Sequence, residues 1–511
     1  MEQERKREEF LACQGHALVI GGPGSGKTTI ALQKALIRIN QGLLPGQSVL
    51  FVSFSRAAVG RIIEASKLHI KAGQERMLDI QTFHSFFWKV LSSHAYLLGS
   101  PKPLRIMLPQ EEQIHFGKIK KKDRNIKNPE WGKWLQERER LFREEGLIAF
   151  DLFADNALAL VQRSNHIKRL IAQKHPLIII DEAQDTNEKA WLFIEQLAPH
   201  AQLVCLADLE QQIFDHLEGI GPERIDAIKK SLTPLELDLA GQNHRSPNTE
   251  IALFGHDILH GVVKGGVYKG VSAFPYNPRP PAFNLTKTLR MALGALHRQI
   301  KKETGKWGRS VAILTSSGNA AAKVSAALLA SEKAVKHKLL FDENEALLSA
   351  KICAFLLEPK SEDTKHADLA TTIELVRDVK RAAGVAAADQ MQKWADKVKA
   401  GKIPTAGFVK ALESIIQSLI ANPFCGNPGK DWIEIKKLLR GTGNADLQSV
   451  AKYLDYVVGF NRGKLISSGL TTVWERDGAY TSAREVLDSA LTQDQILSGI
   501  DDPNGLQVMT I

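Results

Sequence analysis

The stretch that decides the fold is Gly21-Gly22-Pro23-Gly24-Ser25-Gly26-Lys27-Thr28. An apolar run, Ala17–Ile20, precedes it, and a helical pattern beginning at Thr29 follows it. This is the pattern G-x-x-x-x-G-K-[ST] between a short buried strand and a helix, the context that separates a phosphate-binding loop from a chance match. The glycines let backbone N–H groups surround a phosphate chain, and the following helix N-terminus favours negative charge. The complete pattern argues against the alternative, a glycine-rich turn with no ligand.

The residue types of this loop predict how it binds a nucleoside triphosphate. Lys27 is expected to reach the β- and γ-phosphates, and the hydroxyl of Thr28 is expected to bind Mg²⁺. The other predicted nucleotide-binding residues are Gly22, Gly24, Ser25, Gly26 and Thr29. The expected cofactors are therefore ATP and Mg²⁺.

A second apolar run ends in paired acids. Leu177–Ile180 is followed directly by Asp181 and Glu182, as expected for a buried strand that delivers carboxylates to a phosphate site. Asp181 is expected to hold Mg²⁺ through water, and Glu182 to polarise the water that attacks the γ-phosphate. An acid pair at a strand end is a weak signal by itself. Together with the phosphate-binding loop, it predicts ATP hydrolysis.

Composition limits the class of protein. The chain has 511 residues, 44% hydrophobic and 24% charged, which is typical of a soluble globular protein with several domains. Lys and Arg exceed Asp and Glu by ten, which suits a polyanionic partner, although solubility alone also explains such an excess. A charged N-terminus and the lack of a long apolar run predict a cytoplasmic protein with no membrane partner. The four scattered cysteines indicate neither a zinc site nor a disulfide framework.

Strand and helix patterns alternate from residue 1 to about 95. This alternation predicts a parallel sheet with helices on both faces and ligands at the carboxyl ends of its strands. From about 97 to 165 the pattern is helical and highly charged, with a basic cluster at Lys118–Lys127 near Trp131 and Trp134. The cluster predicts either a channel for single-stranded nucleic acid or a solvated helix face beside two core tryptophans. The sequence leaves both possibilities open.

Six segments, in order along the chain, resemble the motifs of superfamily 1 DNA helicases of the UvrD/Rep type. They are GGPGSGKT at 21–28, SFSRAA at 53–58, TFHS at 82–85, IIIDEAQDTN at 178–187, ADLEQQIF at 207–214 and NHRS at 243–246. DEAQDTN is the most specific of these segments, and the resemblance is strong to about residue 250 and weaker beyond. It implies an α/β fold with two RecA-like parallel-sheet phosphate-loop domains, each carrying a mainly helical insertion, the second RecA-like domain being incomplete.

The resemblance also implies domain boundaries. They are 1–96 and 166–260 for the first RecA-like domain, 97–165 for its helical insertion, 285–345 and 501–511 for the partial second RecA-like domain, and 346–500 for the larger helical insertion. Val508–Ile511 is similar to the opening of the family's fifth motif, and the rest of that motif and the sixth do not follow. An alternative to an autonomous helicase is therefore a truncated or split nucleotide-dependent DNA-binding protein that needs a partner polypeptide for catalysis.

The resemblance implies further site residues. Gln211 is expected to sense the γ-phosphate, and Arg245 to contact it from the domain junction. The residues expected to contact DNA are Phe54, Arg56, Thr82 and His84, with Phe54 stacked against a base. The implied activity is ATP-driven 3′-to-5′ movement on single-stranded DNA or at a junction of single and double strands.

Two departures from the family pattern concern recognition of the adenine base. No glutamine lies at the expected distance before the phosphate-binding loop, where a gapless alignment places Lys6. His244 stands where an adenine-stacking tyrosine is usual. The preference for adenine is therefore the less specific part of the prediction.

Overall fold

The structure is a computed structural model in which two compact units are distinguished. It describes residues 2–67, 70, 73–100, 103–208, 222–239, 249–262, 264–277, 279, 284–330, 334–340, 344–457, 461–496 and 505–510. The first unit comprises Met1–Arg105, Leu141–Ala273 and Ile496–Ile500, and the second comprises Ile106–Arg140, Phe274–Gln495 and Asp501–Ile511. The domain boundaries expected from the family resemblance stay a prediction.

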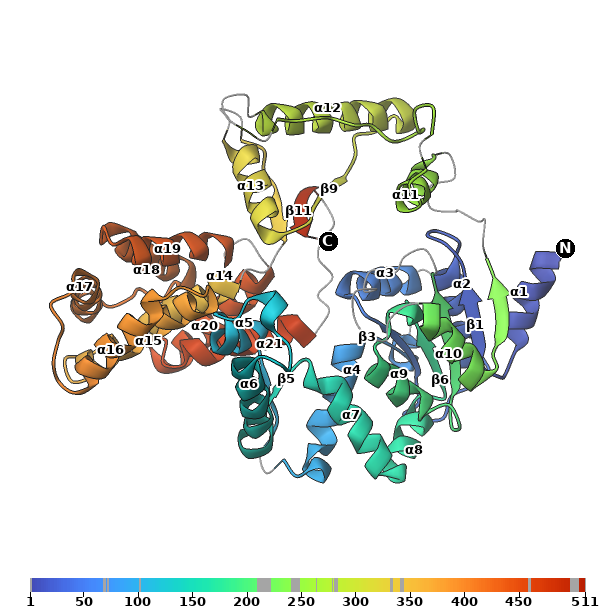
Figure 1. Cartoon of the computed structure of the whole chain (residues 1–511), viewed down its shortest axis with the longest axis horizontal. Helices are drawn as coiled ribbons and strands as arrows, with labels where there is room; N and C mark the ends of the chain where they lie inside the picture. Colours follow the sequence, from blue (N-terminus) through green and yellow to red (C-terminus); the bar gives the residue numbers. More distant parts are fainter. Residues whose placement is uncertain are drawn as a thin grey trace. The chain divides into compact units, whose positions relative to one another are not determined.

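A six-stranded parallel sheet forms the centre of the first unit (Figure 1). Its strands are β1 (Ala17–Ile20), β2 (Val49–Ser53), β3 (Leu78–Thr82), β6 (Leu177–Ile180), β7 (Gln202–Ala207) and β8 (Leu235–Asp238), in the order β3-β2-β6-β7-β1-β8. Every residue of β2 and β6 is buried, which explains why these strands are continuous apolar runs rather than alternating ones. The parallel α/β architecture predicted from the sequence is confirmed.

Nine α-helices accompany this sheet in the described part of the first unit. They are α1 (Glu2–Ala12), α2 (Lys27–Asn40), α3 (Arg56–Lys67), α4 (Phe83–His94), α7 (Leu152–Arg163), α8 (Asn165–Lys174), α9 (Glu188–Glu195), α10 (Pro222–Leu232) and α11 (Ile251–Leu259). The core joins Phe10 of α1 and Ala31 of α2 to Phe51, Ile179 and Val204 of the sheet. Burial of these side chains holds α2 against the strands whose ends form the candidate site.

Lys34 links α1 to α2. Its buried ammonium group donates hydrogen bonds to the backbone carbonyls of Phe10 (3.2 Å), Leu11 (2.8 Å) and Cys13. The last carbonyls of a helix have no partner within the helix and carry partial negative charge, so a cation stabilises them. Lys34 therefore fixes the end of α1 to the helix that follows the phosphate-binding loop.

The second unit contains a smaller parallel sheet. Its strands are β9 (Ser310–Thr315), β10 (Lys338–Leu340) and β11 (Gly505–Thr510), and β11 lies between the other two. The core beside it includes Ala321 and Leu328 from α13 (Gly318–Leu329), with Leu289 and Leu293 of α12 (Leu285–Thr304) packed against it. Two segments almost 200 residues apart, β9 and β11, thus form one sheet.

Ten further α-helices lie in the described part of the second unit. They are α5 (Pro109–Phe116), α6 (Pro129–Arg140), α14 (Asn344–Leu357), α15 (Lys365–Ala382), α16 (Ala387–Lys399), α17 (Gly407–Ala421), α18 (Pro428–Gly441), α19 (Ala445–Val457), α20 (Asn461–Asp477) and α21 (Ala483–Ile496). Two short strands, β4 (Arg105–Met107) and β5 (Leu147–Ala149), lie near the points where the chain passes between the units. No helix in the described residues is both long and apolar enough to cross a membrane.

The sequence predicts a helical pattern for the basic segment at 118–127, and this prediction is wrong. The segment contains one 3₁₀ turn at Lys121–Asp123 and is otherwise irregular. Asn125 accepts a hydrogen bond from the backbone N–H of Lys127, and Asn128 donates to the carbonyl of Asp123. Such local side-chain bonds compete with helix formation.

The two tryptophans that follow this segment pack against aromatic neighbours. Trp134 is buried and stacks on His115 with ring centroids 4.4 Å apart, and Trp131 packs edge-on against Phe116 at 5.4 Å. This packing favours the interpretation of core tryptophans over a nucleic-acid channel.

Candidate active site

The candidate site lies at the carboxyl edge of the six-stranded sheet. Parallel pairing places the ends of neighbouring strands together, with Ile20 beside Ala207 and Ser53 beside Thr82. Val52 is likewise paired with Ile180. The phosphate-binding loop, the acid pair and the predicted DNA-contacting residues therefore all follow strands at one edge, where ligands of such sheets bind.

The phosphate-binding loop depends on its glycines. Gly24 and Gly26 have φ of +77° and +93°, values that side-chain-bearing residues seldom adopt. A Cβ atom on Gly21 would lie 2.5 Å from Oγ of Ser25, so this position has no room for a side chain. The Ser25 hydroxyl is buried and has no hydrogen-bond partner within the described residues. A buried donor without a partner fits a ligand that brings an oxygen acceptor into the loop.

Lys27 lies inside the loop and contacts three oxygens. Its Nζ donates to the carbonyls of Gly21 and Gly22 (3.2 Å) and forms an ion pair with Oδ2 of Asp208 (3.3 Å). The Lys27 side chain is 10% exposed and that of Asp208 is 2% exposed. A buried charge pair of this kind is strongly destabilised when one partner is removed alone. The anionic group that compensates Lys27 here is therefore Asp208.

Asp181 is a buried carboxyl group whose negative charge is only partly compensated by its neighbours. Ser53 donates a hydrogen bond to it over 3.4 Å. Burial, followed by the neighbouring charge of Glu182, raises the pKa of Asp181 from 3.8 to about 6, and the positive charge of Lys27 opposes this rise. A nearby cation favours the charged form of a carboxyl group. A divalent cation would therefore be favourable beside Asp181. Thr28, the other predicted ligand, is half-buried in the first turn of α2.

Glu182 adopts an unusual backbone conformation. Its φ of +52° and ψ of +48° are left-handed, although it is not a glycine. Such conformations cost about 1–3 kcal/mol and gather at functional sites. The amide nitrogen of Gln184 donates to its Oε2 at 2.9 Å. The predicted water-activating carboxylate is therefore held by both its backbone and its neighbour.

Aromatic side chains follow β2 and β3. Phe54 is half-buried and stacks on the buried Phe83, with ring centroids 4.5 Å apart and planes inclined by 28°. Thr82 is buried, and its hydroxyl accepts a hydrogen bond from the backbone N–H of Ser85 (3.1 Å). Thr82 is thus the N-cap of α4, which begins at Phe83.

Two further predicted DNA-contacting residues, His84 and Arg56, also follow these strands in the sequence. His84 is exposed, and its ring lies 5.6 Å from that of Phe150 and 6.1 Å from that of Phe153. Arg56 is exposed in the first turn of α3. The charge of Arg56 and the partial positive charge of the helix N-terminus both attract anions.

The structure brings together only part of the predicted set. Lys27, Ser25, Thr28, Asp181 and Glu182 lie at one edge with the loop glycines, and Phe54, Arg56, Thr82 and His84 follow the adjacent strands. Gln211 and Arg245 lie outside the described residues.

Sequence reasoning missed the roles of Asp208 and Gln184. Asp208 ends the apolar run of β7 in the same way that Asp181 ends β6, and this signal could have identified it.

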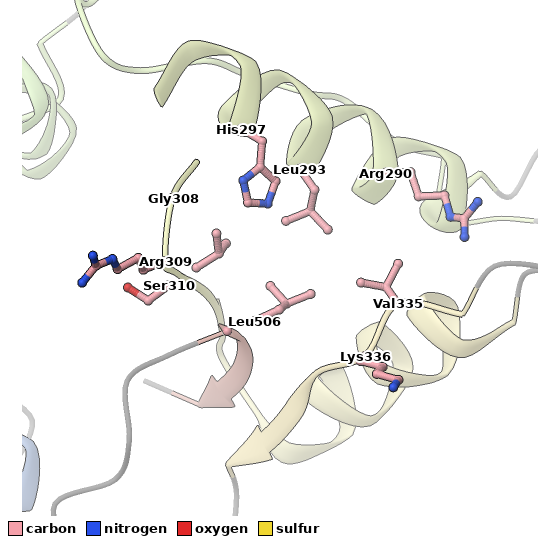
Figure 2. A pocket seen from close by; sticks show the side chains of 11 residues that line it. Arg290, Leu293, His297, Gly308, Arg309, Ser310, Val335, Lys336 and Leu506 are labelled. Atoms are coloured by element: carbon pink, nitrogen blue, oxygen red, sulfur yellow. The ribbon is translucent and has the colours of Figure 1, made fainter. Parts of the chain in front are cut away.

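A separate cavity of 590 Å³ lies in the second unit. Figure 2 shows Leu293 and His297 of α12 pointing towards it from one side, with Leu506 at the start of β11 opposite. It is bounded by the amino ends of β9 and β11, whereas ligands of parallel sheets gather at the carboxyl ends. It is therefore not part of the candidate site.

Known proteins resemble this chain over its first half. Residues 2–133 and 108–230 match the UvrD/REP helicase N-terminal domain. The chain is 24% identical to DNA helicase II of Haemophilus influenzae over 282 residues, covering 48% of this chain and 38% of that protein. It is 23% identical to the ATP-dependent DNA helicase Rep of Buchnera aphidicola over 267 residues, covering 45% and 40%. For the ATP-dependent DNA helicase PcrA of Staphylococcus epidermidis the identity is 20% over 288 residues, covering 50% and 39%. The chain thus spans well under half the length of these relatives.

Proposed function

We propose that this chain, which belongs to the UvrD/Rep-type superfamily 1 helicases through its residues 2–230, hydrolyses ATP and uses the energy to move along single-stranded DNA. The main support for this proposal is the buried ion pair between Lys27 and Asp208, 3.3 Å apart, at the glycine-rich loop. Beside it lies a buried Ser25 hydroxyl with no partner among the described residues. Both features suit a ligand with several phosphate oxygens.

Nucleotide binding begins with an exchange of partners at Lys27. The ammonium group leaves the Asp208 carboxylate and donates to the β- and γ-phosphates, while Ser25 and the backbone N–H groups of the loop donate to other phosphate oxygens. Gly22, Gly24 and Gly26 allow the backbone to approach the phosphates. Bound Mg²⁺, held by Thr28 and Asp181, would neutralise phosphate charge.

Glu182 acts on the attacking water. Its carboxylate accepts a hydrogen bond from the water whose oxygen attacks the γ-phosphorus, and the bond from that phosphorus to the bridging oxygen of ADP breaks. The water's protons pass to Glu182 and to the phosphate product. Lys27 stabilises the charge that develops on the departing ADP oxygen, and we assign Gln211 and Arg245 to sensing and neutralising the γ-phosphate.

DNA is proposed to bind at the ends of β2 and β3. The half-exposed ring of Phe54, supported from behind by Phe83, offers a face on which a base can stack, and such stacking contributes about 1–3 kcal/mol per base. Arg56 binds a phosphate of the DNA backbone, and Thr82 and His84 contact the same DNA strand. Movement is proposed to run from 3′ to 5′, as the family resemblance implies.

ATP hydrolysis by the chain, with and without single-stranded DNA, tests this proposal. We expect DNA-stimulated turnover that Lys27→Ala and Glu182→Gln abolish. Lys67→Ala removes an exposed lysine of α3 and should leave turnover unchanged. Tight binding of ATP and DNA without turnover would favour the alternative, a nucleotide-dependent DNA-binding protein that needs a partner polypeptide. Lack of ATP binding would refute both.

A further inference from the structure

Gln184 bridges two parts of the candidate site. Its amide nitrogen donates to Oε2 of Glu182 at 2.9 Å, and its amide oxygen accepts from the backbone N–H of Asp208 at 3.1 Å. The residue is fully buried. We propose that Gln184 is a positioning residue that orients the Glu182 carboxylate for hydrolysis and links it to the residue that holds Lys27.

The chemistry of the two partners fixes the orientation of the amide. A carboxylate can only accept a hydrogen bond, and a backbone N–H can only donate one. Turning the amide over would place its oxygen against the Glu182 carboxylate and its nitrogen against the Asp208 N–H, so both contacts would become repulsive. The side chain therefore has one favourable arrangement, and a rigid neighbour is what a positioned general base requires.

The bridge restrains a side chain that would otherwise rotate. Glu182 is only half-buried, and its left-handed backbone directs its side chain unlike the strand residues before it. The bond from Gln184 holds Oε2 and thereby fixes the rotation of the carboxylate, which leaves Oε1 to accept from the attacking water. Misplacing a catalytic group by about 1 Å can cost about 100-fold in rate.

The other end of the bridge reaches Lys27. The N–H of Asp208 binds Gln184, while the carboxylate of the same residue pairs with Lys27 at 3.3 Å. When phosphates take Lys27 from this carboxylate, any resulting shift of Asp208 is transmitted through Gln184 to Glu182. The chain of contacts from Lys27 to Asp208, Gln184 and Glu182 thus connects occupancy of the loop to the position of the base.

Two substitutions separate the hydrogen bond to Glu182 from the one to Asp208. Gln184→Met keeps the length and volume of the side chain and removes both bonds. Gln184→Glu keeps an oxygen to accept from Asp208 but loses the donor to Glu182. Gln110→Met is the matched control, because Gln110 of α5 is a buried glutamine whose amide atoms have no hydrogen-bond partner in the described residues.

The measurements are the kcat of DNA-stimulated ATP hydrolysis and the Kd for ATP of each variant. We expect both Gln184 variants to lose about 10- to 100-fold in kcat, the range for one hydrogen bond to a charged group, with Kd changed less than about threefold. Gln184→Glu should recover as pH falls, because a carboxyl at 184 can donate to Glu182 only when protonated. Gln110→Met should match the unmodified chain.

The inference rests on the proposed ATP hydrolysis, and the outcomes distinguish the two. No turnover by the unmodified chain would overturn the proposed hydrolysis and this inference with it. Normal turnover in both Gln184 variants would overturn the inference alone. So would equal losses of kcat and ATP binding, which indicate a purely structural role. If Gln184→Met does not fold, Gln184→Glu decides, since a kcat loss without the recovery at lower pH would contradict the positioning role.

Discussion

Replacing Asp181 with asparagine should stabilise the first unit while abolishing hydrolysis. Burial and the charge of Glu182 raise the pKa of Asp181 from 3.8 to about 6. A carboxyl whose pKa is raised by folding reduces the free energy of unfolding as it ionises, so this cost is absent below about pH 4 and complete above about pH 6. A rise of this size corresponds to about 3 kcal/mol at pH 7. Asparagine has nearly the same shape and no charge, so it removes this cost.

Hydrogen exchange of the backbone amides of β6 and β7 measures the effect in the nucleotide-free chain. These central strands exchange only when the unit opens, so they report its stability separately from that of the second unit. We expect Asp181→Asn to slow their exchange about 100-fold at pH 7, and the gain in free energy to be about half as large at pH 5. Asp226→Asn, which neutralises an exposed carboxylate in α10, should change stability by less than about 0.5 kcal/mol. Unchanged or faster exchange at pH 7 would refute the reasoning.

Substitutions at three further positions test other parts of the first unit. Phe54→Ala should weaken single-stranded DNA binding about 10- to 100-fold, whereas Phe54→Trp should preserve it. Fluorescence anisotropy measures both affinities, and an affinity of Phe54→Ala equal to that of the unmodified chain would exclude stacking at this position. Gly21→Ala places a Cβ 2.5 Å from Oγ of Ser25, so it should abolish ATP binding, measured by calorimetry, and retained affinity would show that the loop adapts. Lys34→Met leaves the last carbonyls of α1 without their cation and should lower the thermal midpoint by several degrees, and an unchanged midpoint would show that α1 contributes little.

The central strands and the loop could be predicted because local sequence determines them. β2 and β6 are short apolar runs that end at polar residues, which is the pattern of strands buried on both faces. The loop needs glycine at positions of positive φ, and that requirement leaves a spacing visible in the sequence. Once the sheet is parallel, the ends of its strands must meet, so Asp181 follows a strand at the same edge as Lys27.

The contacts between distant side chains could not be predicted in the same way. Asp208 is 181 residues from Lys27, and only the order of the strands, which places β7 beside β1, brings them together. The contacts of Gln184 depend on its rotamer and on the left-handed conformation of Glu182, which periodicity does not encode. The basic segment at 118–127 misled the prediction because its charge density resembles that of a solvated helix, whereas Asn125 and the neighbouring Asn128 bind the local backbone.

The unsatisfied groups of this site suggest what drives binding. Lys27 and Asp208 already compensate each other, so phosphates that take Lys27 must leave a buried carboxylate behind, and that exchange costs part of the affinity. The negative charge of Asp181 is not compensated in this way, because its pKa is raised even with the positive charge of Lys27 nearby. A divalent cation next to Asp181 would relieve that penalty, and the Ser25 hydroxyl, which has no hydrogen-bond partner among the described residues, would gain an acceptor from a bound phosphate. The favourable contributions to the binding free energy therefore require the metal and the phosphates together. The metal complex of ATP should bind far more tightly than metal-free ATP.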